Sequence, residues 1–543
     1  MNDFFPLQKT CNRKHYLCSE NTKQPLITIT NMKSIGFNNF RKFSHFEPIQ
    51  LGAVNFFVGR NNAGKSTVEK GMMLLAYNLR NMTFDTLGKQ GSLLNAKPTF
   101  RFDVDDVHIG TFEKAIHVGA EKREMTFEAQ IGRFLVTMTV QPQKEENETS
   151  SLLQHVKVQD AETDFEFDFN FSTAEMTLNR RNAAEDEDYN EEDEQLRTYE
   201  ATKEELELLN KKIADLSAQD IVDTNLLSQY TARREQLDKQ LDFLDSKIKK
   251  SKLRFPLTVP MEMHIDLLSD HVIANLIRSF GKVRKGNAIQ YAAKLQMIAN
   301  DFDRAVSLER VEYIHATSAS QNRILSSFDK NDEMARVVRE FNALRDRLEV
   351  EYVVNNWMRD FEIGDHFEIT PLDGEAFKIT VHLADGTRMD LADMGRGSIQ
   401  LMQLFLHLAT LMGQYGHYLV PPTVIIEEPE QNIHPMLQSR LADLLMEFAT
   451  YPQNQNQNAQ PFTVVVETHS EYVIRRTQVM VAQKGYKDEA DLRDDNPFHV
   501  FYFDGSNAEE PYYEMEYRTD GIFENEFGSG FFDEASNLAF SIL

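Results

Sequence analysis

Apolar and polar positions alternate over much of the first third of the chain, which is the pattern of strands buried on one face. Residues 26–30 alternate in this way, and several short strands are expected within residues 99–171. A further strand is expected at residues 54–58, followed by a helix with Met72 and Leu75 on one face. This part of the chain is therefore expected to be rich in β-structure.

Near the middle of the chain the apolar positions change to steps of three and four, the spacing of a heptad. Two such runs predict a short antiparallel coiled-coil hairpin of about three heptads per arm, about 30 Å long. Residues 185–194, with eight acids and no base, are expected to form a solvated loop before it. The heptad positions are Leu206, Leu209, Ile213 and Leu216 in the first arm and Tyr230, Leu237, Leu241, Leu244 and Ile248 in the second.

The net charge of the chain limits the kinds of molecule that it is expected to bind. The 543-residue chain has 58 Lys and Arg against 85 Asp and Glu, a formal net charge of −27. An acidic average surface repels phosphate backbones, so non-specific nucleic-acid binding by the chain alone is disfavoured. Basic strips within residues 247–254 and 278–285 remain local candidates for such a contact, and a solvated helix face is the alternative interpretation.

The low cysteine content and the lack of long apolar stretches indicate the cellular compartment. Its two cysteines, Cys11 and Cys18, are too few for a structural zinc site and suit a reducing compartment. Residues 1–25 have no apolar stretch of the kind found in signal peptides, and no apolar run reaches the length of a membrane span. We expect a cytoplasmic protein without membrane contact.

The strongest chemical signal is Gly-x4-Gly-Lys-Ser between the strand at 54–58 and the following helix, a Walker A motif. Its glycines let backbone N–H groups point at phosphate oxygens, and the helix dipole adds positive charge. Lys65 is expected to lie between the phosphates and to assist catalysis, and the Ser66 hydroxyl to ligate Mg²⁺. The nucleotide-binding residues expected here are Gly59, Asn61, Asn62, Ala63, Gly64, Lys65, Ser66 and Thr67.

Two apolar runs near the C-terminus end in chemically active side chains. The first ends in Glu427 and Glu428, a Walker B arrangement with Glu in place of the usual Asp. Glu427 is expected to hold Mg²⁺, and Glu428 to take a proton from the attacking water. The second run ends in Glu467-Thr-His-Ser, where His469 is expected to hydrogen-bond the γ-phosphate or that water.

A glycine-rich turn opens a helix shortly before the Walker B run. It contains Gly395, Gly397 and Ser398, and such a turn at a helix N-terminus is an anion site. In ABC proteins this position holds the signature motif, which binds the γ-phosphate of ATP held by the other subunit. The same role is expected here, so a homodimer or higher oligomer through the heads is expected.

Together these residues resemble the ABC-type ATPase heads of SMC, RecF-like and OLD-family proteins. Residues 427–435 are similar to the family's Asp-Glu-Pro-Glu-x-x-Leu-His-Pro run, residues 36–43 to its first hairpin and residues 467–470 to its Glu-Thr-His-Ser. The resemblance implies an α/β fold: a two-lobed P-loop ATPase head with mixed sheets and the coiled-coil hairpin inserted. It also implies ATP and Mg²⁺ as cofactors.

These expectations divide the chain into five segments. Residues 1–25 are a polar tail, and residues 26–180 are the N-terminal half of the head with Walker A. Residues 181–255 hold the acidic loop and hairpin, residues 256–310 a helical segment, and residues 311–543 the C-terminal half with signature, Walker B and histidine.

A narrower resemblance is to the PtuA family, the ATPase subunits of Septu antiphage systems, including retron-associated forms. It rests on residues 521–534 and 313–320. It implies a slow or regulatory ATPase that controls a PtuB-like HNH nuclease and, in retron-linked systems, joins reverse transcriptase and retron DNA. Nuclease activity is not expected in the chain itself, because no Asp-x-Asp pair of a Toprim domain follows His469 and no HNH-like cluster occurs. The alternative is an SMC- or RecF-like DNA-repair ATPase acting directly on DNA.

Overall fold

The structure is a computed structural model, which describes residues 32–81, 83–84, 98–142, 150–180, 187–217, 224–251, 256–260, 285–315, 321–329, 331–416, 420–505 and 510–542. The N-terminal tail and the strand expected at 26–30 lie outside these residues. So do the side chains of the two basic strips.

An antiparallel sheet forms the first lobe. Its strands run in the order β13-β12-β11-β10-β9-β8-β1-β2, and the short β4 and β5 pair beside β10. Inward and outward residues alternate strictly along β8 and β9, as the sequence pattern predicts. The strands are β1 (Met32–Phe40), β2 (Phe43–Gln50), β4 (Thr83–Phe84), β5 (Pro98–Arg101), β8 (Met125–Ile131), β9 (Phe134–Gln141), β10 (Ser150–Asp160), β11 (Phe165–Asn170), β12 (Glu175–Arg180) and β13 (Leu257–Pro260).

The second lobe is built on a mostly parallel sheet with the strand order β14-β19-β20-β3-β21-β22. The strand from the N-terminal half, β3, lies between β20 and β21 from the C-terminal half, so the two halves form one sheet. Only β22 at the edge is antiparallel to its neighbour. The strands are β3 (Val54–Gly59), β14 (Val311–Ile314), β19 (Thr423–Glu427), β20 (Thr463–Glu467), β21 (Phe498–Phe503) and β22 (Tyr512–Glu514).

This parallel sheet separates two hydrophobic cores. Alternate residues of its strands face the first core, where α1 (Lys65–Arg80) and α6 (Lys285–Leu308) pack with the antiparallel sheet. The other residues face the second core, with the helices of the C-terminal half. Those helices are α7 (Glu333–Asn342), α8 (Arg347–Asp360), α9 (Arg396–Tyr415), α11 (Arg440–Gln455) and α12 (Glu471–Lys484).

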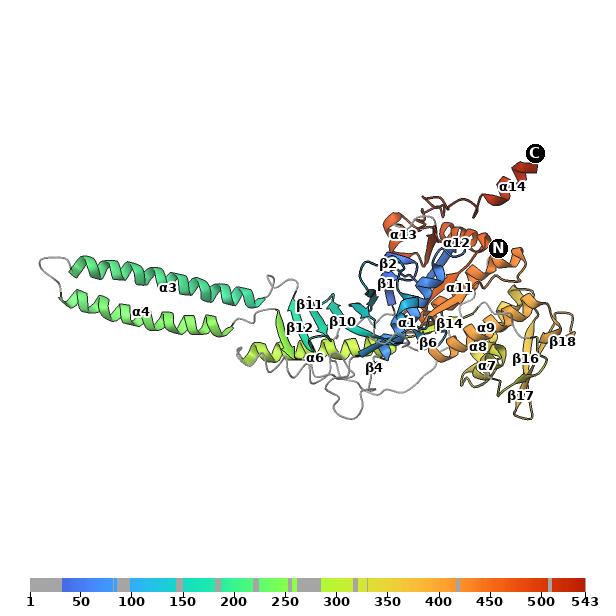
Figure 1. Cartoon of the computed structure of the whole chain (residues 1–543), viewed down its shortest axis with the longest axis horizontal. Coiled ribbons are helices and arrows are strands. Elements are labelled where there is room, and N and C mark those ends of the chain that lie inside the picture. The colour runs from blue at the N-terminus through green and yellow to red at the C-terminus, as the bar shows by residue number, and fades with distance from the viewer. Residues whose placement is uncertain are drawn as a thin grey trace, which may run out of the picture.

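Smaller elements complete the head. A four-stranded sheet of β15 to β18 lies beside α7 and α8, and α14 extends away from the body (Figure 1). These elements are β6 (Asp103–Val104), β7 (Val107–His108), α2 (Phe112–Ala115), β15 (Leu325–Ser326), β16 (His366–Leu372), β17 (Ala376–His382), β18 (Arg388–Asp390), the 3₁₀ turn η3 (Leu391–Asp393), α10 (Pro435–Gln438), α13 (Glu489–Asp495) and α14 (Glu534–Ile542).

A helical hairpin of α3 (Glu187–Ser217) and α4 (Thr224–Ser251) projects from the head (Figure 1). Leu209, Leu237 and Leu244 are buried between the helices, and Arg233 of α4 pairs with Glu205 of α3 at 3.0 Å. The helices have 31 and 28 residues, so each arm spans more than the expected 30 Å, at about 1.5 Å per residue.

One local expectation is wrong, and another is incomplete. Most of the acidic run, from Glu187 onward, is the beginning of α3 instead of a loop. Glu favours helices, and acidic residues near a helix N-terminus interact favourably with its dipole, which offsets their mutual repulsion. The segment expected to be helical at 256–310 also contributes β13, which pairs with β12. Among the described residues, the structure has no helix with the length and apolar character needed to cross a bilayer.

The class predicted from the sequence is confirmed: the head is an α/β, two-lobed P-loop fold of the ABC type with mixed sheets. The phosphate loop follows β3 at the centre of the parallel sheet, and the Walker B and histidine runs end the two strands to one side of it.

Candidate functional site

The loop between β3 and α1 has the backbone that a phosphate loop requires. Gly59 and Gly64 have φ angles of 127° and 121°, and Asn62 one of 59°. A Cβ atom on Gly59 would stand 2.3 Å from the Phe503 carbonyl oxygen, so only glycine fits there. Lys65, the first residue of α1, is buried, and its ammonium group donates to the carbonyl oxygens of Gly59 and Arg60 at 3.1 and 3.0 Å.

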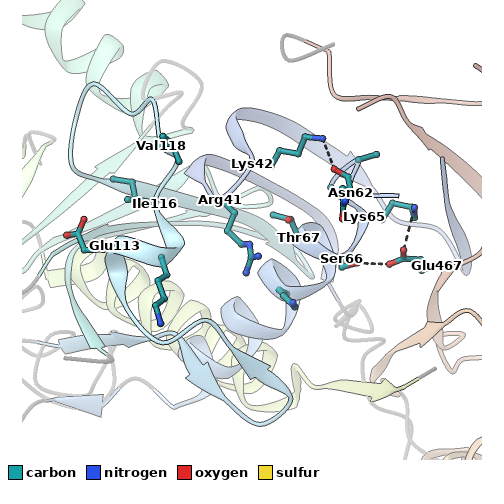
Figure 2. A pocket seen from close by; sticks show the side chains of 14 residues that line it. Arg41, Lys42, Asn62, Lys65, Ser66, Thr67, Glu113, Ile116, Val118 and Glu467 are labelled. Carbon is teal, nitrogen blue, oxygen red and sulfur yellow. Dashed lines mark hydrogen bonds and ion pairs between the residues drawn. The ribbon is translucent and has the colours of Figure 1, made fainter. Parts of the chain in front are cut away.

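A pocket of about 530 Å³ opens over this loop (Figure 2), a volume in the range of small-molecule sites. Lys42 helps to shape it by donating to the Asn62 carbonyl oxygen at 2.7 Å. Five cationic side chains in the lining make the pocket suitable for a polyanion. The lining residues are Arg41, Lys42, Asn62, Ala63, Gly64, Lys65, Ser66, Thr67, Lys70, Glu113, Lys114, Ile116, Val118 and Glu467. They include Asn62 to Thr67, whereas Gly59 and Asn61 belong to the loop without lining the pocket.

Glu467, the last residue of β20, lines this pocket and was missed as a site residue by sequence reasoning. Its carboxylate accepts a hydrogen bond from the Ser66 hydroxyl at 2.9 Å and stands 3.5 Å from the Lys65 ammonium (Figure 2). The side chain is 9% exposed. Glu467 therefore engages two groups that an ATP site needs.

Glu427, the predicted metal ligand, ends β19 on the far side of β20 from β3. One of its oxygens accepts a hydrogen bond from the Tyr313 hydroxyl at 3.0 Å. Burial, together with the neighbouring Glu69 and Glu427, raises the pKa of Tyr313 well above its usual range. The phenol thus stays protonated and orients Glu427.

Glu69 on α1 is a third carboxylate of this region, and it was also missed. It is 1% exposed, and neither of its oxygens has a hydrogen-bond partner among the described residues. Burial, followed by the charges of Glu467 and Glu427, raises its pKa well above the ordinary value. Its position four residues after Lys65 places both on one face of α1, which is the signal that would have found it. The Glu467 carboxylate beside the Ser66 hydroxyl offers oxygen ligands of the kind that Mg²⁺ prefers.

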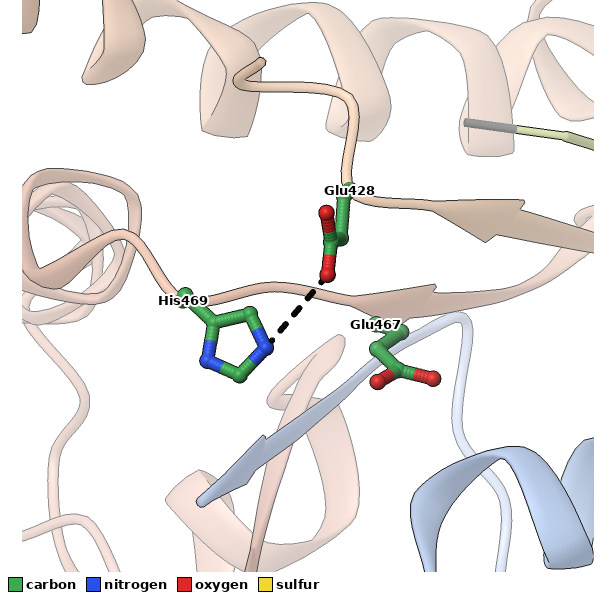
Figure 3. Close-up of side chains that lie close together, drawn as sticks. All are labelled: Glu428, Glu467 and His469. Carbon is green, nitrogen blue, oxygen red and sulfur yellow. Dashed lines mark ion pairs between the residues drawn. The ribbon is translucent and has the colours of Figure 1, made fainter. Parts of the chain in front are cut away.

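Glu428 and His469 form a pair at the ends of β19 and β20 (Figure 3). The His469 Nε2 atom stands 3.5 Å from a Glu428 oxygen, and the Gln431 amide donates to the other Glu428 oxygen. Glu428 has a φ angle of 41°, and its backbone N–H donates to the Glu467 carbonyl at 2.8 Å. This left-handed backbone directs the side chain toward His469. Ligand atoms of Glu428, Glu467 and His469 all lie within 4.8 Å of one another.

The predicted signature turn lies at the start of α9 and not in the loop after β3. Gly395 caps α9, and Gly397 and Ser398 lie in its first turn, as the sequence predicts. In the described part of the chain, the lining of the phosphate-loop pocket includes none of the three. Within one chain the structure does not bring the signature turn to the Walker A site, and its role toward a second subunit stays a prediction.

The fold and the phosphate loop define a P-loop ATPase. A family model, AAA_15, described as an AAA ATPase domain, matches residues 32–474. The chain therefore belongs to this AAA ATPase domain family.

Comparison with solved structures gives matches to SMC heads at low similarity. One is the Smc head domain with an extended coiled coil bound to the C-terminal domain of ScpA from Pyrococcus furiosus. It is 10% identical to this chain, with a TM-score of 0.30, and the match covers 94% of this chain and 99% of that one. Another is the SMC head domain from Thermotoga maritima, with 11% identity and a TM-score of 0.32 over 90% and 99%. No curated protein sequence matches the chain significantly.

Proposed function

We propose that this chain binds ATP with Mg²⁺ in the phosphate-loop pocket, hydrolyses it slowly, and uses it to join two heads and control a partner nuclease. The observation behind the ATPase part is that Lys65 and Ser66 share one pocket with Glu467, beside the Glu428–His469 pair on the adjoining strand ends.

In this proposal Lys65 turns from the carbonyl oxygens of the loop to the β- and γ-phosphates, and the backbone N–H groups of residues 62–66 cradle them. Ser66 with the neighbouring carboxylates would hold a Mg²⁺ ion, which would supply positive charge to the phosphates. Glu428 accepts the proton of the attacking water, and His469 holds Glu428 and that water in place. The proton thus moves from water to a Glu428 oxygen.

Dimerisation is supported by the position of the signature turn. Gly395, Gly397 and Ser398 lie outside the pocket of their own chain, and backbone N–H groups at the start of α9 are suited to bind an anion. We propose that they cap the γ-phosphate of ATP held by a second copy. The assembly would be a homodimer or a higher oligomer of heads.

The partner nuclease is proposed from the resemblance to the Septu ATPase subunits. The net charge of −27 favours a protein partner over non-specific nucleic-acid contact. In this proposal the HNH nuclease subunit cuts nucleic acid during phage infection and the head dimer gates it, with reverse transcriptase and retron DNA joining in a retron-linked system. The rival function is an SMC- or RecF-like ATPase that acts directly on DNA.

The test combines oligomeric state and co-purification. Glu428→Gln protein with ATP and Mg²⁺ is expected to elute as a stable dimer in light scattering, whereas Lys65→Ala protein does not dimerise under the same conditions. Co-expression with the genes that neighbour its own is expected to yield a complex with a nuclease subunit. Failure to obtain a nuclease, together with salt-sensitive DNA binding and DNA-stimulated hydrolysis by the isolated chain, would establish the rival function.

A further inference from the structure

We propose that Glu467 is a direct ligand, together with Ser66, of the divalent cation that accompanies ATP, and that Glu427 is not the principal ligand. This inference rests on the proposed function of the pocket as an ATP site. It assigns the metal to a residue outside the Walker B pair.

The order of strands supports this assignment. β20 pairs directly with β3, so that Glu467 lies beside Phe57 in the parallel register. Glu427 is the register partner of Glu467 on β19, one strand further from β3. Because neighbouring strands lie about 4.8 Å apart, the backbone of Glu427 begins about one strand spacing further from the phosphate loop. Glu467 therefore needs the shorter reach to Ser66.

The distance between the two proposed ligands supports it further. Mg²⁺ binds six oxygens in near-ideal octahedral geometry at about 2.0–2.1 Å, which places two adjacent ligand oxygens about 2.9 Å apart. The Ser66 hydroxyl oxygen and a Glu467 oxygen are 2.9 Å apart. This distance is that of an ordinary hydrogen bond, and it also brings the two oxygens close enough to be adjacent ligands of one cation.

Glu69 is an independent observation at the same place. Its side chain is almost completely buried, and in the described part of the chain its two oxygens lack hydrogen-bond partners. A buried carboxyl group that accepts no hydrogen bond costs free energy, and a cation bound beside it at Glu467 would supply a compensating positive charge.

The contact between Glu467 and Lys65 predicts how a bound cation changes the affinity for ATP. A Glu467 oxygen stands 3.5 Å from the Lys65 ammonium, and Glu467 lines the pocket proposed for the triphosphate. An uncompensated Glu467 charge would compete with the phosphates for Lys65 and repel them. When a cation binds Glu467, both effects disappear. Removing the Glu467 charge should therefore strengthen ATP binding in the absence of metal and weaken the gain that metal brings.

The experiment measures ATP affinity of the full chain by calorimetry, in EDTA and in Mg²⁺, for wild type, Glu467→Gln and Glu427→Gln. Wild type is expected to bind more tightly with Mg²⁺. Glu467→Gln is expected to bind ATP at least as tightly as wild type in EDTA and to lose about 10-fold or more of the Mg²⁺ effect. Glu427→Gln is expected to retain most of that effect. The inference is overturned if Glu467→Gln keeps the full Mg²⁺ effect or if Glu427→Gln is the variant that loses it.

A direct metal measurement gives a second readout. Mn²⁺ binding in the presence of ATP, followed by electron paramagnetic resonance, should weaken in Glu467→Gln. The spectrum should change in Glu467→Asp, which keeps the charge but shortens the reach of the side chain. Unchanged Mn²⁺ affinity and spectrum in both variants would overturn the inference. If wild type itself binds no ATP in either condition, the proposed function fails instead, so the two failures are distinguishable.

Discussion

Gly397, in the first turn of the signature helix α9, lies so close to Asn432 that a Cβ atom on it would stand 2.4 Å from the Asn432 carbonyl oxygen. The Asn432 amide also donates to Gln400 of α9 at 3.0 Å. Asn432 belongs to the loop that follows Glu428, so this contact couples the start of α9 to the loop that follows the proposed catalytic base.

Gly397→Ala should therefore disturb hydrolysis without removing the phosphate loop. The added methyl group must push α9 away from the Asn432 carbonyl, at a cost of about 1–3 kcal/mol in unfolding free energy. We expect a lower Tm and a reduced rate of ATP hydrolysis. Gly395→Ala is the matched control, because no atom of the described residues lies within 4 Å of its Cβ position and its φ of −61° suits alanine. Equal effects of the two substitutions on Tm would contradict this account of the contact.

Glu428→Gln should separate binding from hydrolysis. The amide cannot accept a proton from water, so kcat should fall by about 10²–10⁴-fold while ATP affinity stays close to that of wild type. Steady-state phosphate release and calorimetry measure the two quantities. Glu471→Gln, at the start of α12, is a control that should leave both unchanged. A Glu428→Gln protein with ordinary turnover would exclude Glu428 as the base.

Glu309 gives a prediction about pH and stability. It is buried beyond the end of α6, and burial raises its pKa from 4.5 to about 8. Since the folded state favours the protonated acid, the stability that this group contributes is fully present below pH of about 4.5 and is lost as pH rises through about 8.

Glu309→Gln should remove this dependence. At pH 8.5 the variant is expected to be more stable than wild type by a few kcal/mol, and near pH 5 the two should be similar. Thermal unfolding at both pH values measures the difference, with the exposed Asp303→Asn on α6 as control. A gain in Tm that is the same at pH 5 and pH 8.5 would show that ionisation of Glu309 is not its cause.

The local sequence pattern was enough to predict the elements that carry the proposed nucleotide site. The helix that begins at Lys65 and the strands that end at Glu427 and Glu467 are set by apolar runs and by the glycine pattern of one short segment. The helical hairpin followed from heptad spacing for the same reason. In each case the signal lies within a window of about 20 residues.

The contacts between these elements could not be predicted from the local sequence pattern. Ser66 and Glu467 are 401 positions apart in the chain, and only the pairing of β20 with β3 brings them together. Periodicity predicts that a strand exists but not which strand it pairs with, so a motif alone predicts Glu427 as a metal ligand and gives no sign of Glu467. Acidic composition predicts a solvated loop at the start of α3, whereas the helix propensity of Glu favours the helix that the structure shows.

The central claim is that the loop before α1 holds the phosphates of ATP through Lys65. Calorimetric titration of wild type, Lys65→Ala and Arg80→Ala with ATP in the presence of Mg²⁺ tests it most directly. Arg80 is an exposed cation at the other end of the same helix, so its removal changes net charge equally and leaves the pocket intact. The account predicts that Lys65→Ala loses about 10-fold or more in affinity while Arg80→Ala binds like wild type. Equal ATP affinity in all three proteins would contradict it.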